Sequence, residues 1–84
     1  MHAIERMFQR DISEAEVRDI LENGQVIESR ADDLPFPSRL LSGRSKGRAV
    51  HVLVSEDPKL RLTVVVTVYL PDPKRWDRTF RHRR

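Results

Sequence analysis

His51, Thr67 and Tyr69 carry the side chains of this sequence that are best suited to acid–base chemistry. An imidazole titrates near neutral pH and can act as a general acid or base. A tyrosine can donate a hydrogen bond or stack on a nucleobase, and a threonine hydroxyl can orient a phosphate or a water molecule. Metal-independent RNA cleavage needs a base for the 2′-hydroxyl proton, an acid for the leaving oxygen and fixed positive charge. We therefore treat these three residues as candidate catalytic residues.

Fixed positive charge is available in the segment 34–54, which holds basic residues and no acidic residue. Arg39, Arg44 and Arg48 carry planar guanidinium groups, whose forked N–H donors suit phosphate oxygens. We expect these arginines to bind RNA phosphates near His51. The alternative is that His51 is a partly buried histidine with a hydrogen-bonded ring and that the arginines are solvated surface charges.

A second cluster of candidates lies at the N-terminus. On a helix predicted over residues 2–10, His2, Arg6 and Arg10 fall on one stripe with i, i+4, i+8 spacing. Helix N-termini attract anions, so His2 and Arg6 are further catalytic candidates if this helix borders the His51 face, and Arg10 is a candidate phosphate-binding residue. The alternative is an ordinary solvated helix surface.

The basic character of the chain is concentrated in its C-terminal tail, which begins at about residue 74. Residues 1–73 hold ten Lys or Arg and twelve Asp or Glu, whereas residues 74–84 hold six Lys or Arg and only Asp77. A basic tail attracts polyanions, so Arg81 is expected to contact RNA phosphates without sequence preference. The alternative is a frayed terminus.

Length and composition restrict the class of protein. The 84 residues form one small domain, residues 1–84, without cysteine for disulfides or thiolate metal sites. The three histidines lack metal-ligand spacing, so we expect neither a metal nor another cofactor. No apolar run is long enough to span a membrane and no secretory signal is visible, so we expect a cytoplasmic protein.

Periodicity predicts helices first and strands afterwards. Ile4, Met7 and Phe8 share one face of the helix over 2–10. Ser13 and Glu16 form a capping box for a second helix, which Asn23-Gly24 ends, with Gly24 expected in the left-handed conformation. The strands are predicted at residues 25–30, 38–43, 48–55 and 60–69.

These elements predict an α+β fold, α-α-β-β-β-β, in which two N-terminal helices pack on a four-stranded antiparallel sheet. In the last two strands the even positions are nearly all aliphatic, so the helices are expected to cover that face. The other face is expected to be open to solvent and to carry Arg39, His51, Thr67 and Tyr69. Trp76 is expected to pack the tail against the domain, together with Phe80.

Three groups of residues occur in a set order along the chain. They are His2, Ala3, Arg6, Met7, Arg10, Ile12 and Ser13; then Gly43, Arg44, Gly47, Arg48, His51 and Val52; then Val66, Thr67, Val68, Tyr69, Pro71, Asp72, Pro73 and Trp76. In this order they resemble a family of small bacterial proteins, domain of unknown function (DUF) 4258. The resemblance implies a RelE-like fold, related to the barnase, colicin and RelE group of metal-independent ribonucleases. It also implies a toxin that cleaves RNA and a small antitoxin partner, commonly with a zinc-finger domain.

Two functional hypotheses follow. The first is a toxin of a toxin–antitoxin system, a metal-independent endoribonuclease that cleaves free or ribosome-bound messenger RNA. The second is a non-catalytic module that binds nucleic acid or a protein through the exposed sheet face and the basic tail. The sequence does not fix the oligomeric state, because an edge strand can pair with an antitoxin segment or with a second copy.

Overall fold

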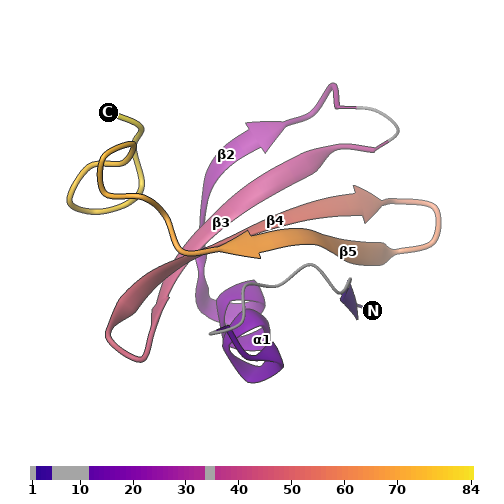
Figure 1. The fold of residues 1–84 in the computed structure, drawn as a ribbon. Helices are drawn as coiled ribbons and strands as arrows, with labels where there is room; N and C mark the ends of the chain where they lie inside the picture. Colours follow the sequence, from indigo (N-terminus) through magenta and orange to yellow (C-terminus); the bar gives the residue numbers. More distant parts are fainter. Residues whose placement is uncertain (1, 5–11, 34–35) are drawn as a thin grey trace.

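In the part of the chain that the structure describes, one helix and a five-stranded sheet make up the fold (Figure 1). The computed structural model describes residues 2–4, 12–33 and 36–84. The elements are β1 (His2–Ile4), α1 (Glu14–Asn23), β2 (Gln25–Arg30), β3 (Ser38–Ser45), β4 (Arg48–Asp57) and β5 (Leu62–Tyr69). The strand order is β1-β5-β4-β3-β2, in which β2 to β5 form the predicted antiparallel meander and β1 lies parallel to β5 at the edge.

The prediction of two helices packed on the sheet is wrong. Residues 2–4, which were expected to begin the first helix, pair as a strand with residues 63–65 of β5. Residues 5–11 lie outside the described part of the chain. A parallel partner far along the chain stabilises β1, and local periodicity carries no information about such a partner. The described fold is therefore mostly β, with one helix on one face of the sheet.

Helix α1 begins as the sequence predicts. The Ser13 hydroxyl accepts a hydrogen bond from the Glu16 N–H at 3.2 Å, and the Glu16 carboxylate accepts one from the Ser13 N–H at 3.2 Å. This capping box satisfies two N–H groups that the first turn leaves without helical partners. The end of α1 differs from the prediction, because Gly24 is extended, with a φ of −72°. Glycine is needed there for close packing, since an added Cβ would lie 2.6 Å from the Ile20 carbonyl oxygen.

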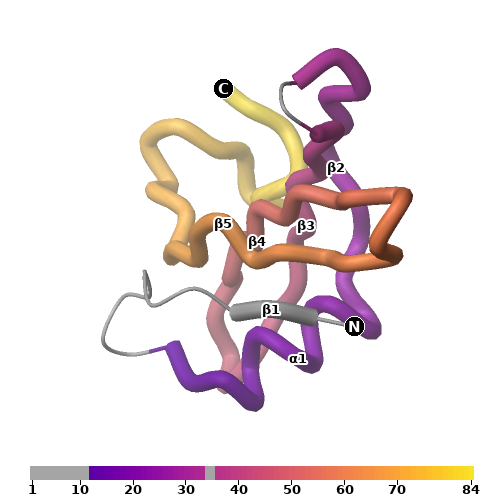
Figure 2. The backbone as a smooth tube through the Cα atoms, turned by 90° about the vertical axis from the view of Figure 1, so that its right-hand side faces the viewer, coloured from indigo at the N-terminus to yellow at the C-terminus, as the bar shows by residue number. Residues whose placement is uncertain are grey.

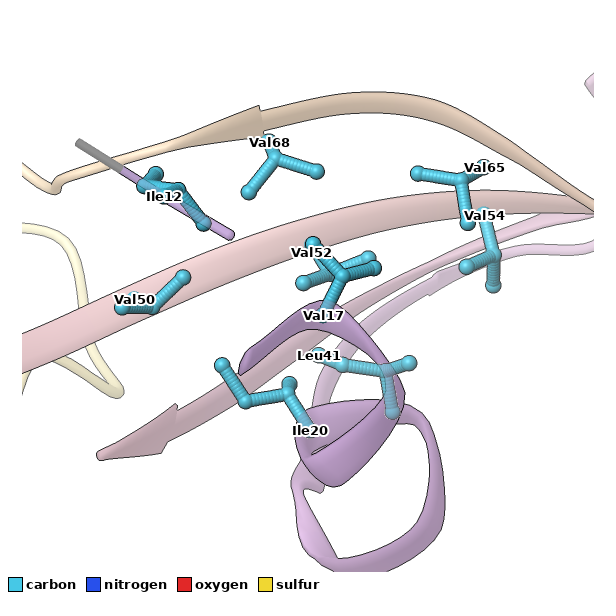
Figure 3. Packing of buried hydrophobic residues seen from close by; sticks show 9 residues of the cluster. All are labelled: Ile12, Val17, Ile20, Leu41, Val50, Val52, Val54, Val65 and Val68. Atoms are coloured by element: carbon cyan, nitrogen blue, oxygen red, sulfur yellow. The ribbon is translucent and has the colours of Figure 1, made fainter. Parts of the chain in front are cut away.

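The hydrophobic core lies between α1 and the facing side of the sheet (Figure 3). Its buried residues are Ile12, Val17, Ile20, Leu41, Val50, Val52, Val54, Val65 and Val68. Along β4 the even-numbered residues face the core, as predicted. In β5 the pattern shifts by one residue, so that both Val65 and Val68 face the core. Leu53 pairs with Thr67 and Val54 with Val65, so Val66 bulges out of the ladder and is 38% exposed. Leu60 is 71% exposed, because it lies in the turn before β5.

Residues 71–84, which we call the C-terminal segment, cover one end of the opposite face of the sheet, where they contact His51 and Ser42. Figures 1 and 2 show this segment on the side of the sheet away from α1. It closes on itself through a bridge between Trp76 and Arg83. Trp76 is only 3% exposed, which confirms that it packs the tail against the domain. The prediction of a solvent-open sheet face is therefore wrong at His51, which has no exposed surface.

Candidate functional site

His51 lies beneath the C-terminal segment, with no exposed surface. Its Nε2 lies 2.7 Å from the backbone carbonyl oxygen of Phe80, and its Nδ1 lies 3.2 Å from the hydroxyl oxygen of Tyr69. A carbonyl only accepts, so Nε2 carries the proton and the neutral ring's Nδ1 accepts from Tyr69. The Trp76 ring meets the imidazole edge-on, with their centres 4.5 Å apart. His51 thus joins the central strand to the C-terminal segment.

The burial of these two polar rings fixes their ionisation at neutral pH. Burial lowers the pKa of His51, and this effect exceeds the raising effect of the Phe80 carbonyl. Burial also raises the pKa of Tyr69. Both groups are therefore neutral at neutral pH, and the pair consists of a hydroxyl donor and an imidazole acceptor.

Thr67 shares the face of His51 and Tyr69, as the alternation predicts. Tyr69 is the direct cross-strand partner of His51, and Thr67 is the partner of Leu53, two residues further along β4. Thr67 and Tyr69 are half-buried. The three catalytic candidates of the C-terminal half therefore do share one face, although that face carries the C-terminal segment.

Two of the arginines expected near His51 lie on the other side of the sheet, where carboxylates neutralise them. Arg39 pairs with Val54 across the strands, on the α1 side, and forms an ion pair with Glu56. Arg48 lies on the same side and contacts Glu16, with its Nη2 3.2 Å from Oε2. Alternation along β4 explains this placement, because Arg48 has the parity of the core valines.

Arg44 and Arg81, by contrast, line one cavity of about 330 Å³. Arg44 reaches it from β3 and Arg81 from the C-terminal segment. In the described part of the chain, neither guanidinium forms an ion pair with a carboxylate. The cavity is also lined by Asn23, Gln25, Ser42, Gly43, Ala49 and Thr79. We call it the arginine pocket.

The arginine pocket is built by three parts of the chain. The end of α1 and the start of β2 supply two amide side chains, β3 and β4 supply its floor, and the C-terminal segment closes it. The Thr79 hydroxyl donates to the Asp77 carboxylate at 2.7 Å, which orders the turn that precedes Arg81. The arginine and amide donors around this polar cavity make a site for an anion with several oxygens.

The pocket residues fall into predicted and unpredicted ones. The sequence predicted phosphate-binding roles for Arg44 and Arg81 from their charge, but it did not place them together. Asn23, Gln25, Ser42 and Thr79 were not among the candidates. A neutral polar side chain gives no signal of its own, and only the fold of the C-terminal segment brings Thr79 to β3.

The N-terminal candidates contribute nothing to this description. Arg6 and Arg10 lie outside the described residues, and of residues 2–4 only the backbone is described. His2 lies opposite Thr63 at the edge of the sheet, where β1 pairs with β5. Residue 2 is thus part of a strand and not of the predicted helix.

A smaller cavity, of about 250 Å³, lies beside Tyr69. It is lined by Tyr69, Leu70, Asp72, Arg75, Trp76 and Arg83. Arg83 is held by Glu28 of β2, with Nε 2.7 Å from Oε2, and its guanidinium carbon lies 4.6 Å from the centre of the Trp76 ring. The Tyr69 side chain therefore borders a cavity although His51 behind it is buried.

The described residues also set limits on other kinds of site. Among them, no group of three or more His, Cys, Asp or Glu side chains is arranged to hold a metal ion. In the same part of the chain, no helix has the length and apolar content that crossing a membrane requires.

Comparisons with known proteins identify one family. The model of a family described as "Domain of unknown function (DUF4258)" matches residues 1–70. Comparisons with curated proteins and with solved structures gave no significant match. The matched region ends at the last residue before the C-terminal segment, so the family pattern contains Arg44 and His51 but not Arg81.

Proposed function

Because the chain belongs to the DUF4258 family, whose description states no activity, we propose a function from the site itself: the protein binds RNA and holds a backbone phosphate in the arginine pocket. The observation that carries this proposal is the convergence of Arg44 and Arg81 on one polar cavity without a neutralising carboxylate among the described residues. Their forked donors match phosphate oxygens.

The size and charge of the region support the same ligand. The cavity volume of about 330 Å³ exceeds what a phosphate group alone fills and lies near the lower end for small-ligand pockets. It therefore leaves room for the adjoining sugar. The surplus of basic residues over 74–84 adds a positive field that attracts a polyanion to this side of the sheet.

Fluorescence anisotropy with a short, labelled single-stranded RNA tests the proposal. Arg44→Ala and Arg81→Ala should each weaken binding by about tenfold, as expected when a charge-assisted hydrogen bond is lost. Arg18→Ala is the matched control, because Arg18 is exposed on α1 and paired with Glu14; it should change affinity by about twofold or less. Equal losses in all three variants would show nonspecific attraction and contradict a pocket.

RNA cleavage is the second candidate function. The observation in its favour is that Tyr69 hydrogen-bonds to His51 and also borders a cavity with Arg75 and Arg83. There the hydroxyl would be the proton-transfer group and the arginines would stabilise the phosphorane. Purified protein should then cut messenger RNA, alone or on ribosomes, and Tyr69→Phe should abolish the cleavage. Cleavage unchanged by Tyr69→Phe would exclude this role.

A ribonuclease activity would extend the proposal to a toxin of a toxin–antitoxin system, with a small antitoxin as partner. Its support is the resemblance that the sequence carries along residues 2–76. Expression of the wild-type protein should then arrest growth, and co-expression of the protein encoded next to it should restore growth. Growth that expression of the wild-type protein leaves unchanged would contradict the toxin role.

A further inference from the structure

We propose that His51 is a positioning residue: its neutral imidazole holds the Phe80 backbone, and thereby Thr79 and Arg81, at the arginine pocket, so that protonation of His51 dismantles the pocket. This inference rests on the proposed function, because it concerns the regulation of the same site. It assigns a role to a buried polar ring that RNA binding itself does not use.

The link between His51 and the pocket is direct. The Phe80 carbonyl oxygen accepts from His51 Nε2 at 2.7 Å and from the Ser42 hydroxyl at 3.4 Å. Phe80 lies between Thr79 and Arg81, which both line the pocket, and Ser42 lines it as well. The backbone at Phe80 has a φ of 57°, a strained conformation that persists only where contacts hold it.

Protonation would act on this arrangement in two ways. Nδ1 would gain a proton, so the Tyr69 hydroxyl would have to change from donor to acceptor. A positive charge would also appear on a ring with no exposed surface. Burying an uncompensated charge is costly, and moving the C-terminal segment away gives the ring access to water.

The charged groups around His51 do not offset that cost. Glu28, from β2, favours the imidazolium form of His51. However, Glu28 is already paired with Arg83 of the C-terminal segment, and the charge of Arg83 disfavours the imidazolium. Arg44, from β3, lies over Phe80, the residue whose carbonyl His51 contacts, with its guanidinium carbon 6.0 Å from the centre of the Phe80 ring. Its charge also opposes an imidazolium at His51. From β5 the facing group is the neutral Tyr69 hydroxyl. Ala49 and Leu53, the neighbours of His51 on its own face of β4, carry no charge.

The direction of the pH dependence follows. We call the state with the C-terminal segment on His51 the closed state, and the state with the segment moved away the released state. The pKa of His51 is lowered from 6.5 in the closed state, chiefly by burial, so the released state binds the proton more tightly. The closed state is therefore fully favoured above the pKa of the released histidine. Its advantage is lost as the pH falls below about 6.5.

Trp76 makes this release measurable, because it is the only tryptophan in the chain and lies against His51. On going from about pH 7.5 to about pH 5, wild-type emission should shift to the red and affinity for the labelled RNA should fall by about tenfold. His51→Gln should show neither change, because an amide can donate to Phe80 and accept from Tyr69 but does not titrate. His82→Gln is the matched control, since His82 is exposed, and it should respond to acid as wild type does.

Three outcomes would overturn the proposal: a wild type that keeps emission and affinity at about pH 5, a His51→Gln variant that loses both as wild type does, or a His82→Gln variant that loses the response. If His51→Gln does not fold, Tyr69→Phe decides, because losing the donor to Nδ1 should move the acid midpoint to higher pH. An unmoved midpoint would contradict the proposal.

The failure of the proposed function can be told apart from the failure of this inference. If RNA binding proves independent of Arg44 and Arg81, the proposed function fails. An emission shift that His51→Gln abolishes would still support the positioning of the C-terminal segment by His51.

Discussion

His51 and Phe80 are 29 positions apart in the chain, yet Nε2 of the histidine lies 2.7 Å from the carbonyl oxygen of Phe80. This hydrogen bond joins the middle of β4 to the C-terminal segment. The residue type best suited to acid–base catalysis is thus occupied in holding the segment in place. The polar groups of the arginine pocket, which the same segment closes, are left for a ligand.

Glu16 should make the stability of the protein sensitive to acid. The Ser13 backbone N–H lowers the pKa of this carboxyl from 4.5 to about 2, with a further contribution from Arg48 and against the effect of burial. The unfolded chain therefore binds the proton first as the pH falls. The stabilisation by Glu16 is complete above pH 4.5 and is lost progressively as the pH approaches about 2.

Urea unfolding of wild type and Glu16→Gln at several pH values measures this contribution. The glutamine variant should be less stable at neutral pH, and its difference from wild type should shrink as the pH falls below 4.5. Comparing the two proteins removes the effect of the other carboxylates. A difference in unfolding free energy that is the same at pH 7 and at about pH 3 would contradict this assignment.

The N-cap of α1 gives a second prediction. Ser13→Ala removes the hydroxyl that accepts from the Glu16 N–H, so the unfolding free energy should fall by about 1 kcal/mol. Ser29→Ala is a suitable control, because Ser29 is exposed on the edge strand β2, and it should change stability by about 0.5 kcal/mol or less. Equal effects of the two substitutions in urea unfolding would argue against the cap.

The contact between Gly43 and Ile20 gives a third prediction. A Cβ at position 43 would lie 2.8 Å from Cγ1 of Ile20, so Gly43→Ala should cost about 1–3 kcal/mol through overpacking. Ile20→Ala removes the opposing atoms, and the double variant should be more stable than the sum of the two single losses by at least about 0.5 kcal/mol. Additive losses would show that the two side chains do not meet.

Local sequence signals predicted the elements that local contacts form. The capping box at Ser13, the end of α1 before Gly24 and the four antiparallel strands depend on residues close together in the chain. The spacing of Ile4, Met7 and Phe8 fits a helix, but residues 2–4 pair with β5, about sixty positions away. Pairing at that distance leaves no periodic trace in a three-residue strand.

The candidate site was only partly predictable for a related reason. Alternation placed His51, Thr67 and Tyr69 on one face, which the register confirms. It did not show that the C-terminal segment covers this face, because that depends on how Trp76 and Phe80 pack. Charge composition identified Arg44 and Arg81 separately, and only the closed segment brings them to one pocket.

The salt dependence of RNA binding tests the arginine pocket most directly. Each phosphate contact to a single strand contributes about 0.7 to the slope of log affinity against log salt concentration. We therefore expect the double variant, Arg44→Ala with Arg81→Ala, to have a slope that is flatter by about 0.7 for each phosphate contact that is lost, measured between about 50 and 200 mM salt. Arg18→Ala should leave the slope unchanged. A double variant with the wild-type slope would contradict phosphate binding by the arginine pocket.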